Sequence, residues 1–193
     1  MDTKRRIFLA ARKRFERGGV DDVSMRNLAG DIGLTAMALY RHYPDKGSIL
    51  RALTMDALDE WARCVEAIEA ATPVKWLEKE SEAFLDFALK TPRRFEAAFL
   101  LSAPLRDLPR VIDEGLSPPL NKAVAAIRQG QRDGLFCDEP PFSMFMNFWG
   151  LAQGLISLYR AERFSGGEVA FRAIYSTAIR RCLRSFLKEG VKS

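Results

Sequence analysis

The chain contains few cysteines and a single histidine, and these shortages exclude several classes of protein. The three cysteines, Cys64, Cys137 and Cys182, are odd in number and far apart, so we expect neither a disulfide framework nor a metal cluster. A reducing, cytoplasmic location is expected for the same reason. The only histidine, His42, excludes zinc sites built on several histidines. No Gly-rich phosphate loop of either common pattern is present. We therefore expect no catalytic site, no metal and no cofactor.

Long apolar runs are also missing. No run approaches the roughly 18–20 residues that cross a bilayer. The basic N-terminus continues into Arg12-Lys13-Arg14 after a short apolar stretch, unlike a signal peptide. Apolar residues nevertheless make up 48% of the 193 residues, which excludes a disordered or fibrous chain. The length suits one medium domain, or a small domain joined to a larger one. We expect no membrane association.

Positive charge is concentrated at the start of the chain. The formal net charge is +5. Residues 1–51 hold eleven Lys and Arg against six Asp and Glu, whereas residues 52–193 hold nineteen of each. A local basic surface indicates a polyanionic partner such as a nucleic acid, although a solvated helix face would give the same count.

Apolar residues recur at helical spacing in almost every segment, and no long stretch alternates with the period of a strand. Glycine, proline and the N-capping residues Ser24, Thr35 and Asp45 mark the predicted ends. The proline-rich segment 103–119 is predicted to be partly loop. The predicted fold class is all-α, with helices over residues 3–17, 25–32, 36–42, 46–71, 73–90, 92–102, 119–132, 142–164 and 167–189.

Residues 24–43 carry the strongest signal. Two short helices are joined through Gly33 and follow a basic helix, an arrangement typical of a DNA-binding helix-turn-helix. Leu28, Ala29, Leu34 and Leu39 are placed to pack the two short helices together. The sequence therefore predicts a small DNA-binding domain at the N-terminus.

Lys46 lies in the first turn of the next predicted helix. A cation there opposes the helix dipole, at a cost of a few tenths of a kcal/mol. A bound phosphate would explain its position, because both the lysine and the helix N-terminus attract a phosphate.

This part of the chain resembles the TetR family of bacterial transcriptional regulators. The resemblance covers about residues 5–55 and rests on the string Leu39-Tyr40-Arg41-His42-Tyr43-Pro44-Asp45-Lys46 at its distance from Ala29 and Gly33. The other matching residues are Ala10-Ala11, Phe15, Gly18, Ser24-Met25-Arg26-Asn27-Leu28-Ala29 and Gly33-Leu34-Thr35-Ala36-Met37-Ala38. Met37, Gly47 and Ile49 depart from the glycine, acidic residue and leucine that are more usual in the family.

The resemblance implies that Tyr40, His42 and Lys46 hold DNA phosphates, that Thr35–Ala38 faces the major groove and that Arg26 reaches a base. Alanine and methionine form no side-chain hydrogen bonds, so we expect mostly apolar readout, such as contact with thymine methyl groups. From the residues alone, a lone histidine is usually incidental, and Tyr43 fits a core aromatic better. The residues predicted to contact DNA are Ser24, Arg26, Thr35, Ala36, Met37, Ala38, Tyr40, Arg41, His42 and Lys46.

The sequence predicts a helix-turn-helix DNA-binding domain in residues 1–47 and a larger helical ligand-binding and dimerisation domain in residues 48–193. The second part resembles the family only in general layout. Phe148–Leu155 is similar to a Trp-x-x-x-His-Gly motif of one C-terminal subfamily, with Gln153 in place of the histidine. Alternatively, Gly150 and Gly154, one turn apart, allow close helix packing.

Aromatic side chains are dense in the second part. Most are expected to form the core, and a subset to line an effector pocket between helices. The candidates include no cluster of cations, so we expect a neutral and largely apolar effector that Gln153 orients. The predicted ligand-binding residues are Trp61, Phe87, Phe99, Met146, Trp149 and Gln153.

The last two predicted helices carry apolar stripes. Two such helices from each of two chains would form a four-helix bundle, and the alternative is burial within one chain. The predicted dimer-interface residues are Leu151, Leu155, Leu158, Phe171, Ile174, Ala178, Cys182 and Phe186.

Together these observations predict a homodimeric repressor that binds double-stranded operator DNA. A small, mostly apolar effector is expected to release it from the DNA. An activator or an effector-independent regulator fits the same residues. The alternative from another class is a helical carrier or enzyme whose basic N-terminus binds something else. The lack of a catalytic constellation disfavours an enzyme.

Overall fold

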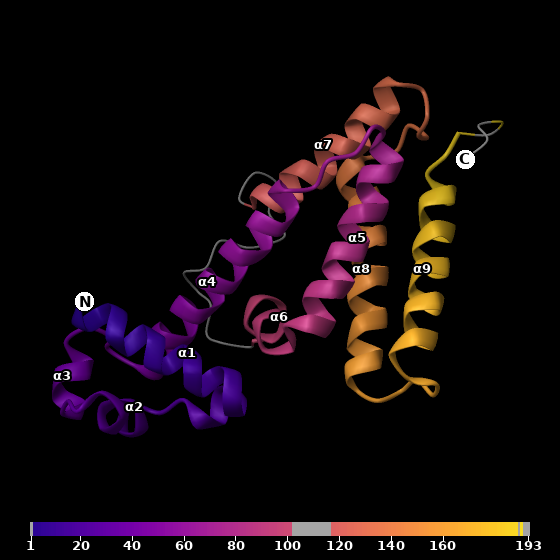
Figure 1. The fold of residues 1–193 in the computed structure, drawn as a ribbon. Helices are drawn as coiled ribbons and strands as arrows, with labels where there is room; N and C mark the ends of the chain where they lie inside the picture. The colour runs from indigo at the N-terminus through magenta and orange to yellow at the C-terminus, as the bar shows by residue number, and fades with distance from the viewer. Residues whose placement is uncertain (1, 102–116, 189, 191–193) are drawn as a thin grey trace. The chain divides into compact units, whose positions relative to one another are not determined.

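The structure is a computed structural model that describes residues 2–101, 117–188 and 190. Figure 1 shows its helices from indigo at the N-terminus to yellow at the C-terminus. Among the described residues they are the only regular elements besides an isolated β-bridge between Phe136 and Leu187, so the predicted all-α class is confirmed. None of these helices combines the length and apolar character that a membrane span requires. The helices are α1 (Thr3–Asp22), α2 (Met25–Ile32), α3 (Ala36–Tyr40), α4 (Lys46–Glu66), α5 (Pro73–Lys90), α6 (Pro92–Phe99), α7 (Pro118–Arg132), α8 (Pro141–Arg160) and α9 (Gly167–Ser185).

The chain divides into two compact units. The first unit is Met1–Trp61 with Phe87–Leu108, and the second is Ala62–Asp86 with Pro109–Ser193. Both divisions fall inside helices, so α4 and α5 each contribute residues to both units. The functional boundary predicted after residue 47 stays a prediction.

In the first unit, α1 buries one face because its apolar residues recur every four positions. Ile7, Ala11 and Phe15 are at most 2% exposed. The helical path breaks at Gly19, whose φ of 68° and ψ of −156° suit a residue without a Cβ. A final turn then continues to Asp22. The break predicted at the glycines is confirmed, and the sequence did not indicate the extra turn.

The two short helices α2 and α3 are fixed at their ends. The Ser24 hydroxyl accepts a hydrogen bond from the Asn27 amide (3.1 Å), and the Thr35 hydroxyl accepts one from the Ala38 amide (3.3 Å). Gly33 ends α2 in the left-handed conformation, with φ 68° and ψ 34°. α2 packs against both α1 and α3 (Figure 1). The predicted helix-turn-helix and both of its N-caps are therefore present.

The start of α4 is also capped as predicted. The Asp45 carboxylate accepts a hydrogen bond from the Ser48 amide (2.6 Å), and the Ser48 hydroxyl donates to the Asp45 carbonyl (2.6 Å). This reciprocal cap satisfies groups that a helix end leaves free, and it determines where α4 begins.

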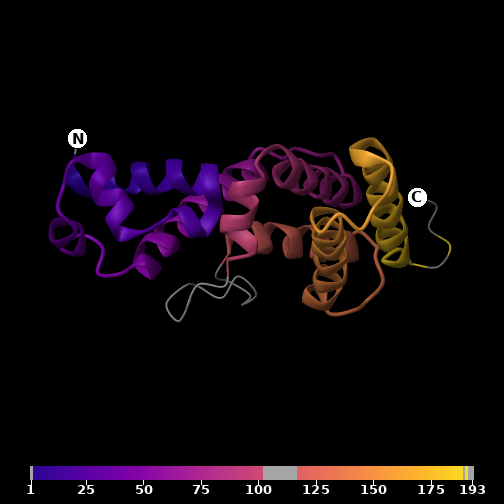
Figure 2. The ribbon, with the colours of Figure 1, turned by 90° about the horizontal axis from the view of Figure 1, so that it is seen from below.

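In the second unit, α8 and α9 lie side by side, and α7 packs against α8 (Figures 1 and 2). The buried residues of each helix recur every three or four positions, which gives one buried face per helix. On α8 this face includes Phe148, Ala152 and Ile156, and on α9 it includes Phe171, Tyr175, Ile179 and Leu183.

The segment after α7 is fastened to the end of α9. An ideal Cβ at Gly130 would lie 2.2 Å from the ring of Phe136, which is fully buried. The Phe136 ring packs edge to face on Phe186, with 6.1 Å between centroids. The Cys137 amide donates to the Phe186 carbonyl at 2.7 Å. Only glycine at position 130 leaves room for this arrangement.

Several helices end earlier than the sequence predicts. α4 ends at Glu66 instead of residue 71, because Val65 is its last buried residue and residues 69–71 are exposed. α9 ends at Ser185 because the chain turns there to bring Leu187 into its β-bridge. Most of the predicted loop 103–119 lies outside the described residues. The remaining differences are α3 ending at Tyr40, α6 at Phe99 and α8 at Arg160, with α7 starting at Pro118 and α8 at Pro141.

We expect Gly130→Ala to destabilise the second unit, although alanine is better than glycine within a helix by about 1 kcal/mol. The added methyl group would overlap the buried Phe136 ring, and overpacking of this kind costs about 1–3 kcal/mol. Gly30→Ala in α2 is the matched control, because no atom lies within 4 Å of its Cβ position. Thermal unfolding should give a lower melting temperature for Gly130→Ala and an equal or higher one for Gly30→Ala. A Gly130→Ala protein that melts with the wild type would contradict the contact.

Candidate nucleic-acid interface

The exposed face of α3 is set by the residues that lie on its other side. Leu39 is fully buried, and Tyr43, one turn further on, is 6% exposed. Because these two side chains point inward, the opposite side of the helix faces solvent. Met37 is 74% exposed there and Tyr40 is 47% exposed. Also exposed are Thr35, Ala36, Arg41 and His42, whereas Ala38 and the capping residue Ser24 are half-buried.

Two arginines beside this face have no acidic partner among the described residues. Arg26 lies in the first turn of α2 and Arg41 directly follows α3, and both are exposed. A guanidinium group presents several N–H donors in a plane, which suits a phosphate or the edge of a guanine. Their chemistry therefore fits the predicted DNA contacts.

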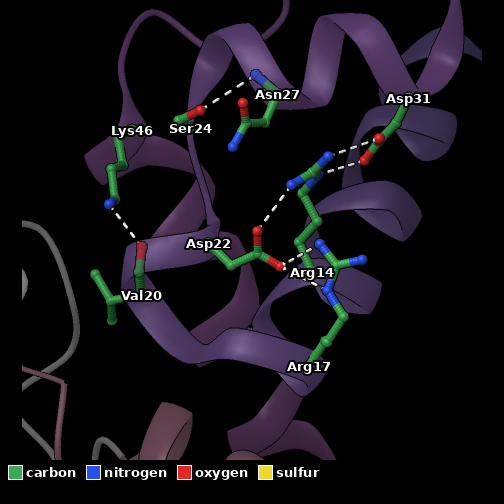
Figure 3. A network of polar contacts seen from close by, with 8 residues as sticks. All are labelled: Arg14, Arg17, Val20, Asp22, Ser24, Asn27, Asp31 and Lys46. Atoms are coloured by element: carbon green, nitrogen blue, oxygen red, sulfur yellow. Dashed lines mark hydrogen bonds and ion pairs between the residues drawn. The ribbon is translucent and has the colours of Figure 1, made fainter.

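The two arginines near the end of α1 form hydrogen bonds with aspartates of the same unit (Figure 3). Arg14 donates hydrogen bonds to Asp22 (2.8 Å) and to both carboxylate oxygens of Asp31, and Arg17 donates to Asp22 (2.7 Å). The hydrogen bond from Arg14 lowers the pKa of Asp31 and raises the pKa of Arg14. The Arg14–Asp31 pair ties α1 to α2, whereas the pairs with Asp22 lie within α1.

Lys46 is half-buried and already has a partner. Its ammonium group donates a hydrogen bond to the Val20 carbonyl at 2.6 Å (Figure 3). This bond satisfies a carbonyl at the end of α1, and it accounts for a cation in the first turn of α4 without a phosphate. The ammonium group has two further N–H donors. The phosphate contact therefore stays a prediction.

Tyr43 is a core residue, as the residues alone indicated. It is 6% exposed, and the Lys4 ammonium lies 5.8 Å from the centroid of its ring. Burial is the main cause that raises the pKa of the Tyr43 hydroxyl. The contact holds the N-terminus of α1 beside the end of α3. The exposed Lys4 and Arg5 thereby add positive charge near the exposed face of α3.

Three of the predicted ligand-binding residues belong to an aromatic cluster in the first unit. The centroid of the Trp61 ring lies 5.8 Å from that of Phe87 and 6.2 Å from that of Phe99. Phe95 lies 5.2 Å from Phe99. Trp61, Phe87 and Phe95 are at most 6% exposed, so these rings pack mainly on one another. Their contact with a ligand stays a prediction.

The other three predicted ligand-binding residues lie on α8 in the second unit. Met146, Trp149 and Gln153 recur every three or four residues, so they follow one side of the helix, and all three are half-buried. The Trp149 ring stacks on Phe145, with 6.4 Å between centroids. The side-chain oxygen of Gln153 is buried and has no hydrogen-bond partner among the described residues. A buried acceptor without a donor costs free energy, which a ligand carrying a donor would recover.

Six of the eight predicted dimer-interface residues are at least partly accessible in one chain. Leu158 is 49% exposed and Ile174 is 44% exposed. Gly150 and Gly154 are exposed too, and no atom lies within 4 Å of an ideal Cβ at either position, so neither is needed for packing within the described chain. The half-buried residues of the predicted interface are Leu151, Leu155, Ala178 and Cys182.

Phe171 and Phe186 are different, because both are buried inside the second unit. Phe171 stacks on Tyr159 with 4.2 Å between centroids, and Phe186 packs on Phe136. They are 0% and 4% exposed. Phe171 and Phe186 therefore fit the alternative reading, in which these residues are buried within one chain.

The sequence interpretation did not single out Glu80, a carboxyl on the buried face of α5. Glu80 is 6% exposed, and no described residue forms a hydrogen bond or an ion pair with it. The helical spacing of the sequence indicates that Glu80 is buried. Glu80 follows Leu77 by three residues and precedes Phe84 by four, and both of these residues are buried.

A second buried charge that the sequence did not indicate is Arg94 of α6. It is also 6% exposed, but it is paired with Asp56 and Glu60 of α4 at 2.7 Å each. These pairs hold α6 to α4 within the first unit. No local pattern reveals them, because the partners are more than thirty residues apart in sequence.

Family models match both parts of the chain. Residues 7–53 match the bacterial regulatory proteins of the tetR family, and residues 77–182 match the tetracyclin repressor-like C-terminal domain. The first match covers the helix-turn-helix and the start of α4. A comparison with curated proteins found no match.

Solved structures share the fold at low sequence identity. A protein of unknown function from Rhodococcus sp. RHA1 gives a TM-score of 0.77 at 18% identity, with 97% of each chain covered. The TetR family transcriptional regulator PfmR from Thermus thermophilus gives 0.66 at 23% identity, with 95% of this chain and 100% of that chain covered. A TetR variant from Acinetobacter baumannii AYE in complex with minocycline gives 0.66 at 19% identity, with 95% of each chain covered.

The family matches agree with the helix-turn-helix that the structure presents and with the resemblance carried by residues 24–46. The likeness to the Trp-x-x-x-His-Gly subfamily stays a prediction. With a DNA-binding domain at its N-terminus and a ligand-binding domain after it, the chain belongs to the TetR family of bacterial transcription regulators.

Proposed function

We propose that the chain is a dimeric repressor that binds operator DNA through α3 and leaves it when a small effector binds. The observation that carries the DNA contact is the exposed face of α3, where Met37 is 74% and Tyr40 is 47% exposed on a helix of five residues. Met37 and Ala36 suit thymine methyl groups in a major groove. The Tyr40 hydroxyl and His42 suit phosphates on either side, which position the helix without reading sequence.

Arg26 is the side chain that we propose reads a base. It lies in the first turn of α2, it is exposed, and no described carboxylate competes for its guanidinium group. Since the three residues Ala36, Met37 and Ala38 offer no side-chain hydrogen bonds, polar discrimination between bases falls to Arg26, Thr35 and Arg41.

The proposed effector is small and mostly apolar. The match of residues 77–182 to a tetracyclin repressor-like domain and a structural neighbour solved with minocycline support a small molecule. Release requires that the effector prefer the state that cannot bind DNA. A preference of about 10–100-fold corresponds to about 1.4–2.7 kcal/mol of coupling.

We propose α4 as the element that transmits this preference. Lys46 and Trp61 lie at two points of α4, and both belong to the first unit. Because a helix rises 1.5 Å per residue, these side chains are separated by about 22 Å along one stiff rod. A small tilt at the Trp61 end would therefore displace the end that meets α1.

A second copy of the chain is proposed to cover the exposed apolar residues of α8 and α9. Leu158 and Ile174 supply apolar area, and the open positions at Gly150 and Gly154 let a helix approach closely. One helix-turn-helix reads only a half-site. A two-fold dimer would set two of them about 34–36 Å apart, or a multiple of that, on a near-palindrome.

We expect Arg26→Ala to lower affinity for the specific site by about 1–3 kcal/mol and to leave affinity for random DNA nearly unchanged. Gel shifts with the intergenic DNA next to the gene and with a random duplex of equal length measure both. Lys13→Ala is the charge-matched control, since Lys13 is exposed on α1 and has no acidic partner among the described residues. Its effect should be equal on the two DNAs. An equal loss on both DNAs for Arg26→Ala would contradict base readout.

Lys46→Ala tests whether the ammonium group meets a phosphate besides the Val20 carbonyl. We expect weaker binding to all sequences and a flatter dependence of log affinity on log salt, by about one unit for each phosphate that the variant no longer neutralises. Thermal unfolding of the same variant reports the missing bond to Val20 separately. A lower melting temperature with an unchanged salt slope would show that Lys46 only ties α4 to α1.

Ile174→Asp tests the proposed dimer. An unpaired carboxylate in an interface costs several kcal/mol, so we expect monomers that no longer bind DNA tightly. Met55→Asp is the control, because Met55 is similarly exposed at 38% but lies on α4 in the first unit. Sedimentation velocity at micromolar concentration distinguishes the states. A wild-type protein that sediments as a monomer there would rule out the interface.

A further inference from the structure

Glu80 lies where the pattern of α5 requires an apolar residue. The buried residues around it on this helix are Leu77, Ser81, Phe84 and Ala88. Glu80 itself is 6% exposed, and none of the described residues forms a hydrogen bond or an ion pair with it. The Glu80 side chain is thus largely buried, without a hydrogen-bond or ion-pair partner from the described chain.

The environment keeps this carboxyl group neutral near pH 7. Burial raises the pKa of Glu80 to about 8, because a carboxylate loses its hydration there and no cation compensates. A cation that entered the site would reverse the balance, since it would favour the ionised form. The group is therefore able to ionise in response to a positively charged partner.

The hydroxyl groups that the structure places beside Glu80 give their hydrogens to the backbone. Tyr175 of α9, which is 1% exposed, donates to the Ser81 carbonyl at 3.0 Å. The Ser81 hydroxyl donates to the Glu78 carbonyl at 2.8 Å. Tyr175 also interacts electrostatically with Glu80. Burial is the main cause that raises the pKa of the Tyr175 hydroxyl, and the negative charge of ionised Glu80 is the second. Neither hydroxyl is left to satisfy the carboxyl group.

Gln153 supplies a second buried acceptor in the same unit. Its side-chain oxygen has no hydrogen-bond partner in the described chain. It is carried by α8, which packs against the helix that carries Tyr175. A ligand that carried a donor would satisfy such a buried acceptor.

We propose that Glu80 anchors a protonated nitrogen of the effector, which is therefore an amine on an apolar or aromatic body. This inference rests on the proposed effector-released repressor and replaces the neutral effector expected from the sequence. On binding, the O–H bond of the Glu80 carboxyl breaks and its proton passes to solvent. The carboxylate then pairs with the ligand ammonium.

Proton release gives this site a signature that an apolar pocket lacks. Below the pKa of Glu80, affinity for an amine should rise about tenfold per pH unit, and it should level off near pH 8. Close to pH 6.5 each bound amine should release about one proton. A neutral ligand with the same apolar body should show neither effect.

The test uses the full-length protein with naphthylmethylamine and naphthylmethanol as probes, which share one aromatic body. Isothermal titration calorimetry between pH 6 and pH 8, in buffers of different ionisation enthalpy, gives affinity and proton count. We expect the amine to bind at least about tenfold more tightly than the alcohol at pH 8. Wild-type protein that shows no such preference, including no binding of either probe, overturns the proposal.

Glu80→Gln keeps the shape of the side chain and removes its charge. We expect the preference for the amine, the pH slope and the released proton to disappear, while the alcohol binds as before. Glu82→Gln is the matched control, because Glu82 is exposed on the same helix, and it should behave as wild type. Retained preference in Glu80→Gln overturns the proposal. If this variant does not fold, absence of the wild-type pH slope and proton release overturns it.

Gel shifts with operator DNA separate this inference from the proposed function. If the amine binds through Glu80 and the operator complex stays intact, the amine site stands and effector release is wrong. If the alcohol releases operator from wild type and from Glu80→Gln equally well, while the amine gains nothing from Glu80, release stands and the amine site is wrong.

Discussion

The exposed surface of α3 depends on the burial of Leu39. A helix of five residues has no stability of its own, because nucleation costs more than so few hydrogen bonds return. Leu39, fully buried against α2, and the Thr35 cap hold it in place. With 3.6 residues per turn, the inward position of Leu39 sends Met37 and Tyr40 outward. The surface that we propose contacts DNA is therefore a consequence of core packing one residue away.

The basic residues of the first unit divide into two groups with different tasks. Arg14 is paired with Asp22 and with Asp31 of α2, and Arg17 is paired with Asp22, whereas Arg26 and Arg41 have no acidic partner among the described residues. These pairs also cancel the charge of two aspartates that would otherwise repel a phosphate backbone beside the helix-turn-helix. Composition alone counts all these cations together and cannot separate the groups.

Local chemistry accounts for what could be predicted from the sequence. The caps at Ser24, Thr35 and Asp45 act within three residues, so the starts of three helices followed directly from the sequence. Helix ends depend on distant partners: α9 stops where Leu187 meets Phe136, which no nearby residue reveals. The same holds for the candidate site. The exposed row on α3 follows from periodicity, but the isolation of Glu80 depends on what every other helix brings toward it.

The two units differ in whether their buried polar side chains have partners in the described chain. Arg94 in the first unit is paired with Asp56 and Glu60, and their attraction offsets part of the hydration that Arg94 loses on burial. Glu80 and Gln153 in the second unit lack partners in the described chain. An apolar residue at either position would make the unit more stable, since a buried polar group without a partner costs free energy. Arg94 is thus part of a structural ion-pair group, whereas Glu80 and Gln153 lie where we propose that a ligand binds.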